Sequence, residues 1–342
     1  MEIDVLMNFK TEITKIHYDK NAKGLFVKLL ELGSIFYGIG STIKSKLYDK
    51  GILNPKKVNA FVISVGNITT GGVGKTPVVS EIAKYLIDNE EKVAIISRGY
   101  GGKLSNKKIN IISDGENIFY NAKLAGDEPF WLAQNTKGCI VITTKNRYKG
   151  AKFAIEKFRA TKIILDDGFQ HRKLYRNLDI VLMDSKMGFG NEKLLPAGPL
   201  REGLEAFSRI NKLVIVSKDV NHSRAEKLAK IMAKKMKVST TVCKTEPNFV
   251  YNIKTGEKLA NDAEITAICA IGQPKQFYQF LDSYKIKQTI DFDDHHIYTE
   301  QELPIGIIVT TEKDAVKMKD FTRNDIYALK LKTSIDVADL LK

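Results

Sequence analysis

Cysteine is scarce in this sequence, with three residues of this type among 342. The three are far apart, and none belongs to a Cys-x-x-Cys pair or to a cysteine and histidine series with the spacing of zinc ligands. A disulfide scaffold and a structural zinc site are therefore excluded. The composition fits a protein that works in a reducing compartment.

Long hydrophobic runs are also missing. The most apolar stretch near the N-terminus, residues 32–43, has twelve residues, which is fewer than the about 20 that a membrane-spanning helix needs. Apolar residues do recur with helical spacing from Leu25 to Leu47, and five lysines lie between Lys23 and Lys50. This pattern predicts an amphipathic helix, which lies either on an anionic membrane surface or against the protein's own domain.

Acidic residues are outnumbered by basic ones, at 40 against 54, which leaves a formal net charge of +14. A surplus of this size predicts an anionic partner, such as nucleic acid, a phosphorylated metabolite or an acidic membrane surface. The sequence has neither a helix-turn-helix pattern nor interleaved aromatic and basic residues, so we do not expect nucleic acid to be the partner.

A glycine-rich loop follows a β-branched run at residues 61–65 and precedes a helix that we expect to start near Pro77. Backbone N–H groups of such a loop surround phosphate oxygens, while Lys75 reaches the β- and γ-phosphates and the hydroxyl of Thr76 ligates Mg²⁺. The strict pattern has glycine where this chain has Thr69, so the loop is a variant. The residues expected to bind ATP are Thr69, Thr70, Gly71, Gly72, Val73, Gly74, Lys75 and Thr76.

Acidic residues occur at two further places that suit this chemistry. Asp166 and Asp167 end a predicted strand at residues 162–165, where P-loop enzymes hold an acid near Mg²⁺. Parallel strands deliver ligands from their carboxyl ends, so we expect both carboxylates beside the loop. Asp127 and Glu128 open a predicted helix, and His295 and His296 follow a predicted strand. With no zinc-ligand spacing, these histidines suit acid-base work or pairing with a carboxylate.

The order of the predicted elements indicates an α/β fold. Short β-rich runs alternate with helical segments after Pro55, which is typical of a P-loop NTPase-like, mostly parallel sheet flanked by helices. The composition changes near residues 205–211, ahead of a lysine-rich helix expected at 222–237. We therefore expect an N-terminal extension with the amphipathic helix at 1–50, a P-loop domain at 51–208, which the resemblance described next implies to be a P-loop kinase domain, and a second, smaller α/β domain at 209–342.

The sequence resembles one family, the tetraacyldisaccharide 4′-kinases of lipid A biosynthesis. The resemblance extends from about Leu25 to the C-terminal part of the chain, and its segments occur in the family's order. They are SVGNITTGGVGKTP at 64–77, SRGYG at 97–101, GDEP at 126–129, LDDGFQH at 165–171, LPAGPLRE at 195–202, DH at 294–295 and TEKD at 311–314. Residues 1 to about 20 are an extension that the resemblance does not cover.

The resemblance implies roles for single residues. Asp127 and His295 would form the catalytic pair, with His295 favoured over His296 because it completes the Asp-His segment. The acids that hold Mg²⁺ or its waters would be Glu128, Asp166 and Asp167, together with Thr76. The 1-phosphate of the substrate would be held by arginines in matching loops, namely Arg98, Arg147 and Arg201.

The resemblance also implies a cofactor pair, a substrate and a location. The expected reaction is ATP-dependent and Mg²⁺-dependent phosphorylation of the 4′-hydroxyl of an acylated glucosamine disaccharide 1-phosphate, at the cytoplasmic face of the bacterial inner membrane. Two other functions are compatible with the phosphate loop. A partitioning-type switch ATPase would carry lysine where this chain has Thr70, and a soluble small-molecule kinase would use the basic surplus only to attract its substrate.

Overall fold

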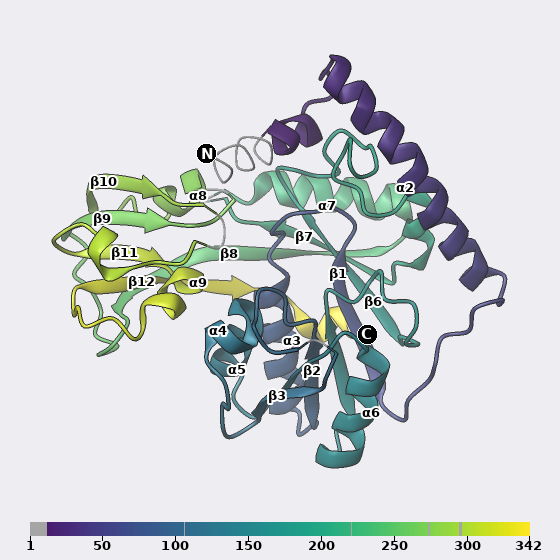
Figure 1. Cartoon of the computed structure of the whole chain (residues 1–342), viewed down its shortest axis with the longest axis horizontal. Coiled ribbons are helices and arrows are strands. Elements are labelled where there is room, and N and C mark those ends of the chain that lie inside the picture. The colour runs from purple at the N-terminus through teal and green to yellow at the C-terminus, as the bar shows by residue number, and fades with distance from the viewer. Residues whose placement is uncertain (1–11, 106, 220, 273, 294–295) are drawn as a thin grey trace.

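The computed structural model describes residues 12–105, 107–219, 221–272, 274–293 and 296–342. Its central feature is a sheet of twelve strands in the order β10-β9-β11-β12-β8-β7-β6-β1-β5-β2-β4-β3 (Figure 1). The strands are β1 (Phe61–Asn67), β2 (Val93–Ser97), β3 (Asn110–Asp114), β4 (Ile140–Thr143), β5 (Lys162–Asp166), β6 (Leu178–Asp184), β7 (Lys212–Ser217), β8 (Ser239–Asn252), β9 (Glu264–Cys269), β10 (Lys285–Asp291), β11 (Ile308–Thr311) and β12 (Ile326–Ser334).

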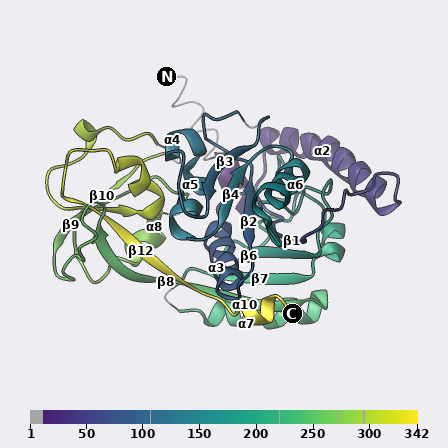
Figure 2. The ribbon, with the colours of Figure 1, turned by 90° about the horizontal axis from the view of Figure 1, so that it is seen from below.

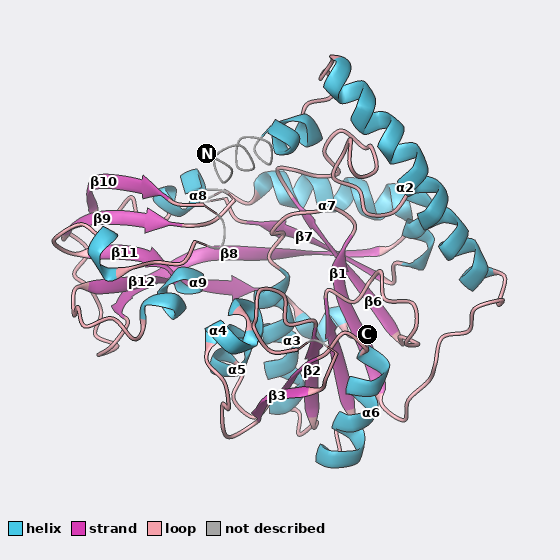
Figure 3. Ribbon diagram, in the orientation of Figure 1, coloured by secondary structure: helices cyan, strands magenta, loops and turns pink. Residues whose placement is uncertain are grey.

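Helices lie along the strands (Figure 3). They are α2 (Leu25–Asp49), α3 (Lys75–Asp88), α4 (Ala122–Ala125), α5 (Asp127–Asn135), α6 (Arg147–Phe158), α7 (Ser223–Met236), α8 (Pro274–Gln279), α9 (Glu312–Ala315) and α10 (Val337–Leu340), with 3₁₀ turns at Leu204–Arg209, Glu300–Glu302 and Val316–Met318. A further helical segment covers residues 12–18.

The strands β1, β2 and β4 to β7 form a parallel core, which has helices on both faces. Helices α3, α5 and α10 pack on one face, against side chains such as Ile63 and Ile95. Helices α6 and α7 pack on the other, against side chains such as Val62 and Met183. Covering both faces explains why the central strands are continuous apolar runs, as in β2, whose five residues are all buried.

The long strand β8 extends the sheet into the C-terminal part of the chain. Its first half, up to Lys244, pairs in parallel with β7, and its second half, from Lys244 to Asn252, pairs antiparallel with β12. Strands β9 to β12, with α8 and α9, form a second lobe at one end of the sheet (Figure 1). The α/β class, the mostly parallel sheet and the second smaller unit are confirmed. The boundary between residues 208 and 209 stays a prediction, and the sheet itself continues across it through β7.

Several elements differ from those expected. Helix α3 begins at Lys75, two residues before Pro77, because a proline in the first helical turn has no N–H to lose from the helical hydrogen bonds. The edge strand β3, the long strand β8 and helix α6 were not predicted. The strand expected ahead of the two histidines is β10, an exposed edge strand that has only two isoleucines.

Helix α2 confirms the amphipathic helix that the sequence predicted from Leu25 to Leu47. It has 25 residues and is long and apolar enough to cross a membrane, by length and composition only. The expectation of a segment too short for that was wrong, because the helix continues through the glycine, serine and lysine residues that interrupt the apolar run. Only Val27 and Leu30 are buried in it. Figure 2 shows α2 and α7 on opposite sides of the molecule.

Candidate active site

The glycine-rich loop between β1 and α3 has the shape of a phosphate loop. Gly71 and Gly74 have φ angles of 104° and 94°, in a left-handed region that glycine adopts without a steric penalty. Gly74 directly precedes α3, so the first N–H groups of that helix open toward the loop. A concave backbone next to a helix N-terminus is suited to bind phosphate.

Thr69, which makes the loop a variant, is in extended backbone, and Thr70 follows it in a bend. Thr69 forms an antiparallel bridge with Leu200, and the N–H of Thr70 donates to the carbonyl of Pro199 at 2.7 Å. The N–H of Arg201 in turn donates to the carbonyl of Ile68 at 2.7 Å. This half of the loop is therefore fixed by the segment that carries Arg201, and a β-branched residue suits its extended conformation.

Lys75 extends from the first turn of α3 to the end of the neighbouring strands. Its ammonium group donates to Oδ1 of Asn67 at 3.3 Å and lies 3.5 Å from Oδ1 of Asp167. The side chain is 13% exposed. The sequence prediction that a lysine of the loop and a carboxylate at the end of β5 come together is therefore met by the geometry. Thr76 follows in the same helical turn and is half-buried.

Asp166 is the last residue of β5 and is 2% exposed. The hydroxyl of Ser97 donates to its Oδ2 at 3.1 Å, whereas within the described residues Oδ1 has no hydrogen-bond partner. Burial, reinforced by the negative charge of Glu128, raises the pKa of Asp166 to about 7. A buried carboxylate oxygen that lacks a donor fits a cation site, since oxygen ligands are those that Mg²⁺ prefers.

Asp167 has the opposite electrostatic balance. Both of its oxygens accept from Nη1 of Arg201 at 2.9 Å. Burial pushes its pKa upward, but Lys75 and Arg201 outweigh that effect, so the pKa lies below its ordinary value. Its φ of 53° is unusual for a residue other than glycine. The chain thus holds two adjacent carboxylates in different protonation environments.

Two of the three arginines predicted to hold substrate phosphate are close to these acids. Arg201 pairs with Asp167, as described. Arg147 is 5% exposed and donates from Nη1 to the carbonyl of Thr144 at 3.3 Å. Burial lowers the pKa of Arg147, the two carboxylates oppose this effect, and the positive charge of Arg98 adds to it. Arg98 is thus connected to the site through Arg147, and its contact with phosphate stays a prediction.

The second lobe reaches the site through Lys317, a residue that the sequence did not single out. Its ammonium group donates to Oδ1 of Asp314 at 3.1 Å and lies 3.8 Å from Oδ2 of Asp127, the first residue of α5. Asp314 is fully buried and also accepts from the N–H of Ala270 and the hydroxyl of Thr311, each at 2.9 Å. Asp314 ends the TEKD segment, but its burial and the approach of Lys317 to Asp127 follow from the fold, so the sequence carried no local signal for this lysine.

The predicted pair of Asp127 and His295 is not settled, because Asp294 and His295 lie outside the described residues. The neighbouring His296 is described. Its Nε2 lies 3.1 Å from Oε1 of Glu302, and its ring stacks on Phe292 with the ring centroids 4.6 Å apart. These contacts give His296 a structural explanation, and His295 remains the predicted catalytic histidine.

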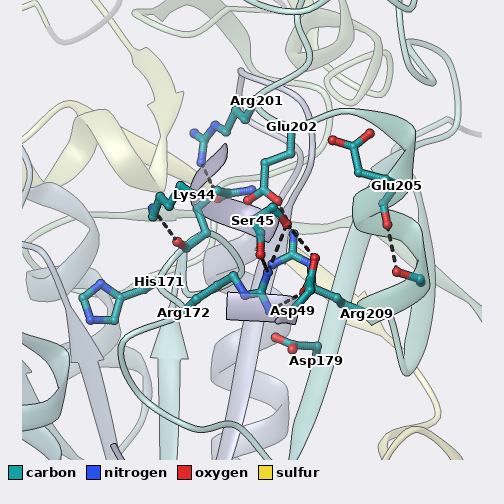
Figure 4. Close-up of polar contacts among 12 residues, drawn as sticks. Lys44, Ser45, Asp49, His171, Arg172, Asp179, Arg201, Glu202, Glu205 and Arg209 are labelled. Carbon is teal, nitrogen blue, oxygen red and sulfur yellow. Dashed lines mark hydrogen bonds and ion pairs between the residues drawn. The ribbon is translucent and has the colours of Figure 1, made fainter. Parts of the chain in front are cut away.

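A cavity of about 400 Å³ lies between α2 and the loops that follow β5 and precede the 3₁₀ turn at Leu204–Arg209. Figure 4 shows several of its polar lining residues. Three cationic side chains line it, Lys44, Arg172 and Arg201. Arg172 donates to the carbonyl and the hydroxyl of Ser45 at 3.1 and 3.0 Å. Lys44 and Arg172 were not predicted as site residues, although Lys44 lies on the amphipathic helix that the sequence indicated.

The protein groups alone do not enclose a metal ion. Within the described ranges, no three histidine, cysteine, aspartate or glutamate residues are grouped closely enough to hold one. This is compatible with Mg²⁺, which is commonly bound through one or two carboxylates together with substrate phosphates and water.

Comparisons with known proteins agree on one family. The family model described as LpxK, tetraacyldisaccharide-1-P 4′-kinase, matches residues 26–342. The tetraacyldisaccharide 4′-kinase of Desulfotalea psychrophila is 39% identical over 322 residues, covering 89% of this chain and 91% of that protein. That of Halothermothrix orenii is 36% identical over 334 residues, covering 87% and 84%.

A solved structure is similar over nearly the whole chain. It is the crystal structure of LpxK from Aquifex aeolicus in complex with ATP, with a TM-score of 0.76 and 32% sequence identity. The match covers 93% of this chain and 97% of that one. The fold is therefore shared with an ATP-binding protein of the same family.

The two aspartates should respond to pH in opposite directions. The pKa of Asp166 is raised from 3.8 to about 7. Between these two pH values the native state keeps a proton that the unfolded state has lost, so the free energy of unfolding falls as pH rises. We therefore expect Asp166→Asn to become more stable relative to wild type between pH 4.5 and pH 8, measured by urea unfolding without nucleotide or Mg²⁺.

Asp167→Asn is the matched control. Its lowered pKa means that the charged form contributes stability above the unfolded pKa, and this contribution is lost as pH falls through the folded value. This variant should be less stable than wild type at neutral pH, with a deficit that shrinks in acid. Parallel pH profiles for the two variants would contradict the assignment of the charges.

Proposed function

This chain belongs to the tetraacyldisaccharide-1-P 4′-kinase family, and we propose that it transfers the γ-phosphoryl group of ATP to the 4′-hydroxyl of a tetraacyldisaccharide 1-phosphate in lipid A biosynthesis. The chain is a kinase, hence a transferase, and ATP is its phosphate donor. The observation that supports this assignment best is the meeting of the phosphate loop, the acids at the end of β5 and Asp127 at one place.

Phosphoryl transfer depends mainly on positioning and on neutralising charge. Lys75 lies where a cation at the end of the loop would contact the β- and γ-phosphates. The residues that would hold Mg²⁺ or its waters are Thr76, Glu128, Asp166 and Asp167, and the ion would neutralise charge on the phosphate oxygens. Because Asp166 has an oxygen without a hydrogen-bond partner among the described residues, it is the best placed of these side chains to take a cation.

Asp127 is the residue we assign to the acceptor hydroxyl. It opens α5 beside the second lobe, where the ammonium group of Lys317 is 3.8 Å from its Oδ2. A nearby cation favours the ionised carboxylate, which is the form that accepts a proton or orients a hydroxyl. His295 would assist Asp127, and Lys317 would keep the carboxylate in place.

The cationic cavity beside α2 supports the assignment of the acceptor as a phosphorylated molecule. Arg201 lines it and is the member of the arginine set that faces both the cavity and Asp167. We assign Arg98 and Arg147 to binding of the same substrate phosphate. Because Arg147 is buried, it would act mainly through its charge.

We assign α2 to membrane binding. Seven large apolar side chains of this helix are more than half exposed, namely Leu25, Leu29, Leu32, Ile35, Phe36, Ile39 and Ile43. Its opposite side is attached to the protein, as when the hydroxyl of Ser34 donates to the carbonyl of Leu194 at 2.8 Å. An apolar face at the rim of the cavity would bring an acylated substrate to the site. We propose that this contact is made at the cytoplasmic face of the bacterial inner membrane, the side on which ATP is available.

The alternatives are less well supported. A partitioning-type switch ATPase would be expected to have a lysine in place of Thr70, and here Thr70 is fixed to Pro199 by its backbone. A kinase for soluble small molecules has no use for the exposed apolar face of α2.

The direct test uses the purified protein, ATP labelled at the γ-phosphate, and the acylated disaccharide 1-phosphate in mixed micelles. We expect the label to appear at the 4′-position of the lipid, with Lys75→Ala as the inactive control because it removes the cation on the transferring phosphates. Release of labelled inorganic phosphate without any labelled lipid would show a switch ATPase instead.

The catalytic pair predicts a non-additive set of variants. Asp127→Ala and His295→Ala should each lower kcat by about 10²–10⁴-fold, as expected for acid-base assistance. If the two act as one unit, the double variant should be little worse than either single one. His296→Ala should have a mild effect, because this ring is held by Glu302 and Phe292. Losses that multiply in the double variant would separate the two residues into independent roles.

If α2 binds the membrane, substitutions on its exposed face should weaken vesicle binding without lowering the free energy of unfolding. Leu32, Ile35 and Phe36 are 53%, 59% and 69% exposed, so replacing them with glutamine should leave urea unfolding almost unchanged. Binding to anionic vesicles in a sedimentation assay should weaken strongly, since each buried apolar side chain is worth about 1.5–3 kcal/mol.

The control for this experiment is a pair of packed residues on the same helix. Val27→Ala and Leu30→Ala should instead lower the free energy of unfolding, because both side chains are buried. If the exposed-face variant lost stability to the same extent, α2 would be part of the core, and its assignment to the membrane would be wrong.

A further inference from the structure

Lys218 lies directly behind the phosphate loop. It follows the last residue of β7, and its ammonium group donates to the carbonyl of Gly72 at 2.7 Å. Its stem passes close to the loop as well, since a Cβ built on Gly74 would be 3.6 Å from Cε of Lys218. The side chain is 18% exposed. One side chain therefore contacts the loop at two of its three glycines.

The hydrogen bond to Gly72 determines how the next peptide group is oriented. A peptide unit is planar, so fixing the carbonyl of Gly72 also fixes the direction of the N–H of Val73. That N–H donates to the carbonyl of Gly71 at 3.2 Å, which closes a tight turn at the crest of the loop. A glycine-rich backbone loses much conformational freedom when it is ordered. A turn that is already anchored has lost this freedom beforehand, so nucleotide binding has a smaller entropy cost.

Lys218 is in turn held by Asp184 at the end of β6, whose Oδ2 is 3.7 Å from the ammonium group. Burial lowers the pKa of Lys218, while the charge of Asp184 opposes that effect. Oδ1 of Asp184 accepts from the N–H groups of Lys186 and Met187 at 2.8 and 3.0 Å, so its position is fixed by backbone.

Two further contacts converge on this anchor. Tyr18, in the N-terminal segment that precedes the residues matched by the family model, has its pKa raised by burial and by the charge of Asp184. Its hydroxyl oxygen would be 3.9 Å from a Cβ built on Gly71. From the second lobe, Nε2 of Gln276 donates to the carbonyl of Lys218 at 2.6 Å. Lys218 thus links the loop to the second lobe, and Tyr18 of the N-terminal segment lies on the same loop and is influenced by the same aspartate.

We propose that Lys218 is a positioning residue for ATP, which holds the Gly71 to Gly74 turn in the shape that receives the triphosphate. It acts through the backbone of the loop, whereas Lys75 faces the phosphates. This inference rests on the proposed function only in taking ATP as the bound nucleotide.

The test is direct binding of a fluorescent ATP analogue and Mg²⁺ to the full chain, without lipid, followed by steady-state kinetics. Lys218→Met keeps the length and removes the charge. We expect its Kd and its KM for ATP to rise about tenfold to hundredfold, because a buried hydrogen bond from a charged group contributes an effect of that size. The KM for the acylated acceptor should stay within about twofold of the wild-type value, because this substitution does not change the acceptor site.

Lys186→Met is the matched control. Lys186 lies two residues after Asp184, and its ammonium group pairs with Asp219 without contacting the loop, so its nucleotide affinity should equal that of wild type. Lys218→Arg keeps a cationic donor and should lose less affinity than Lys218→Met. If Lys218→Met fails to fold, Asp184→Asn is measured instead, and it should weaken ATP binding in the same direction.

Two results would overturn the proposal. Unchanged ATP affinity in Lys218→Met, or in Asp184→Asn where that variant replaces it, would show that the loop needs no anchor. Equal increases in the KM values for ATP and for the acceptor would show a general structural defect. Since binding is measured without acceptor, a protein that binds ATP but transfers no label to lipid would contradict the proposed function and leave the role of Lys218 intact.

Discussion

The carboxylates of Asp166 and Asp167 sit at the buried end of β5, where burial opposes the ionisation of both. Cations on neighbouring elements offset this effect of burial more for Asp167 than for Asp166. Lys75 and Arg201 contact Asp167, whereas Asp166 receives one hydroxyl from Ser97 and faces the charge of Glu128. The site therefore holds one ionised acid and one acid that would gain from a cation. The phosphate loop contributes Lys75 to this concentration of charge, α5 contributes Glu128, and Arg147 interacts electrostatically with both acids.

The continuous sheet explains how distant parts of the chain reach that place. Strand β8 pairs with β7 along one half and with β12 along the other, so the second lobe is attached to the P-loop core by backbone hydrogen bonds. The lobe delivers Lys317 to Asp127 and Gln276 to Lys218. Each contact joins a residue of the second lobe to a residue of the core, so the position of the second lobe and the shape of the site depend on each other.

The part of the site that the sequence could predict is local. The phosphate loop is specified by the order of a β-branched run, glycines and a Lys-Thr pair. Two aspartates at the carboxyl end of a strand in a parallel sheet are then expected beside the loop. Even the variant position has a local signal, since Thr69 suits extended backbone, although its partner Leu200 comes from a distant segment.

The remaining features depend on packing between segments far apart in the chain. Nothing near Lys317 or Lys218 in sequence reveals that one ammonium group lies by Asp127 and the other on the carbonyl of Gly72. The burial of Arg147 likewise follows from the packing of α6, a helix that the sequence analysis did not predict. The family resemblance predicted which arginines belong to the site. Only the fold shows that Arg201 contacts Asp167 and that Arg147 is buried.

The central claim is that the buried carboxylate of Asp166 takes the cation that arrives with the nucleotide, and calorimetric proton counting tests it directly. Binding of Mg²⁺ with a non-hydrolysable ATP analogue would be measured near pH 6 in two buffers of different ionisation enthalpy, for wild type and for Asp166→Asn. Since the pKa of Asp166 is about 7 in the free protein, wild type should release close to one proton more than the variant, about the share of that carboxyl protonated at this pH. Equal proton release by the two proteins would mean that Asp166 is already ionised or takes no part in binding, and the account would be wrong.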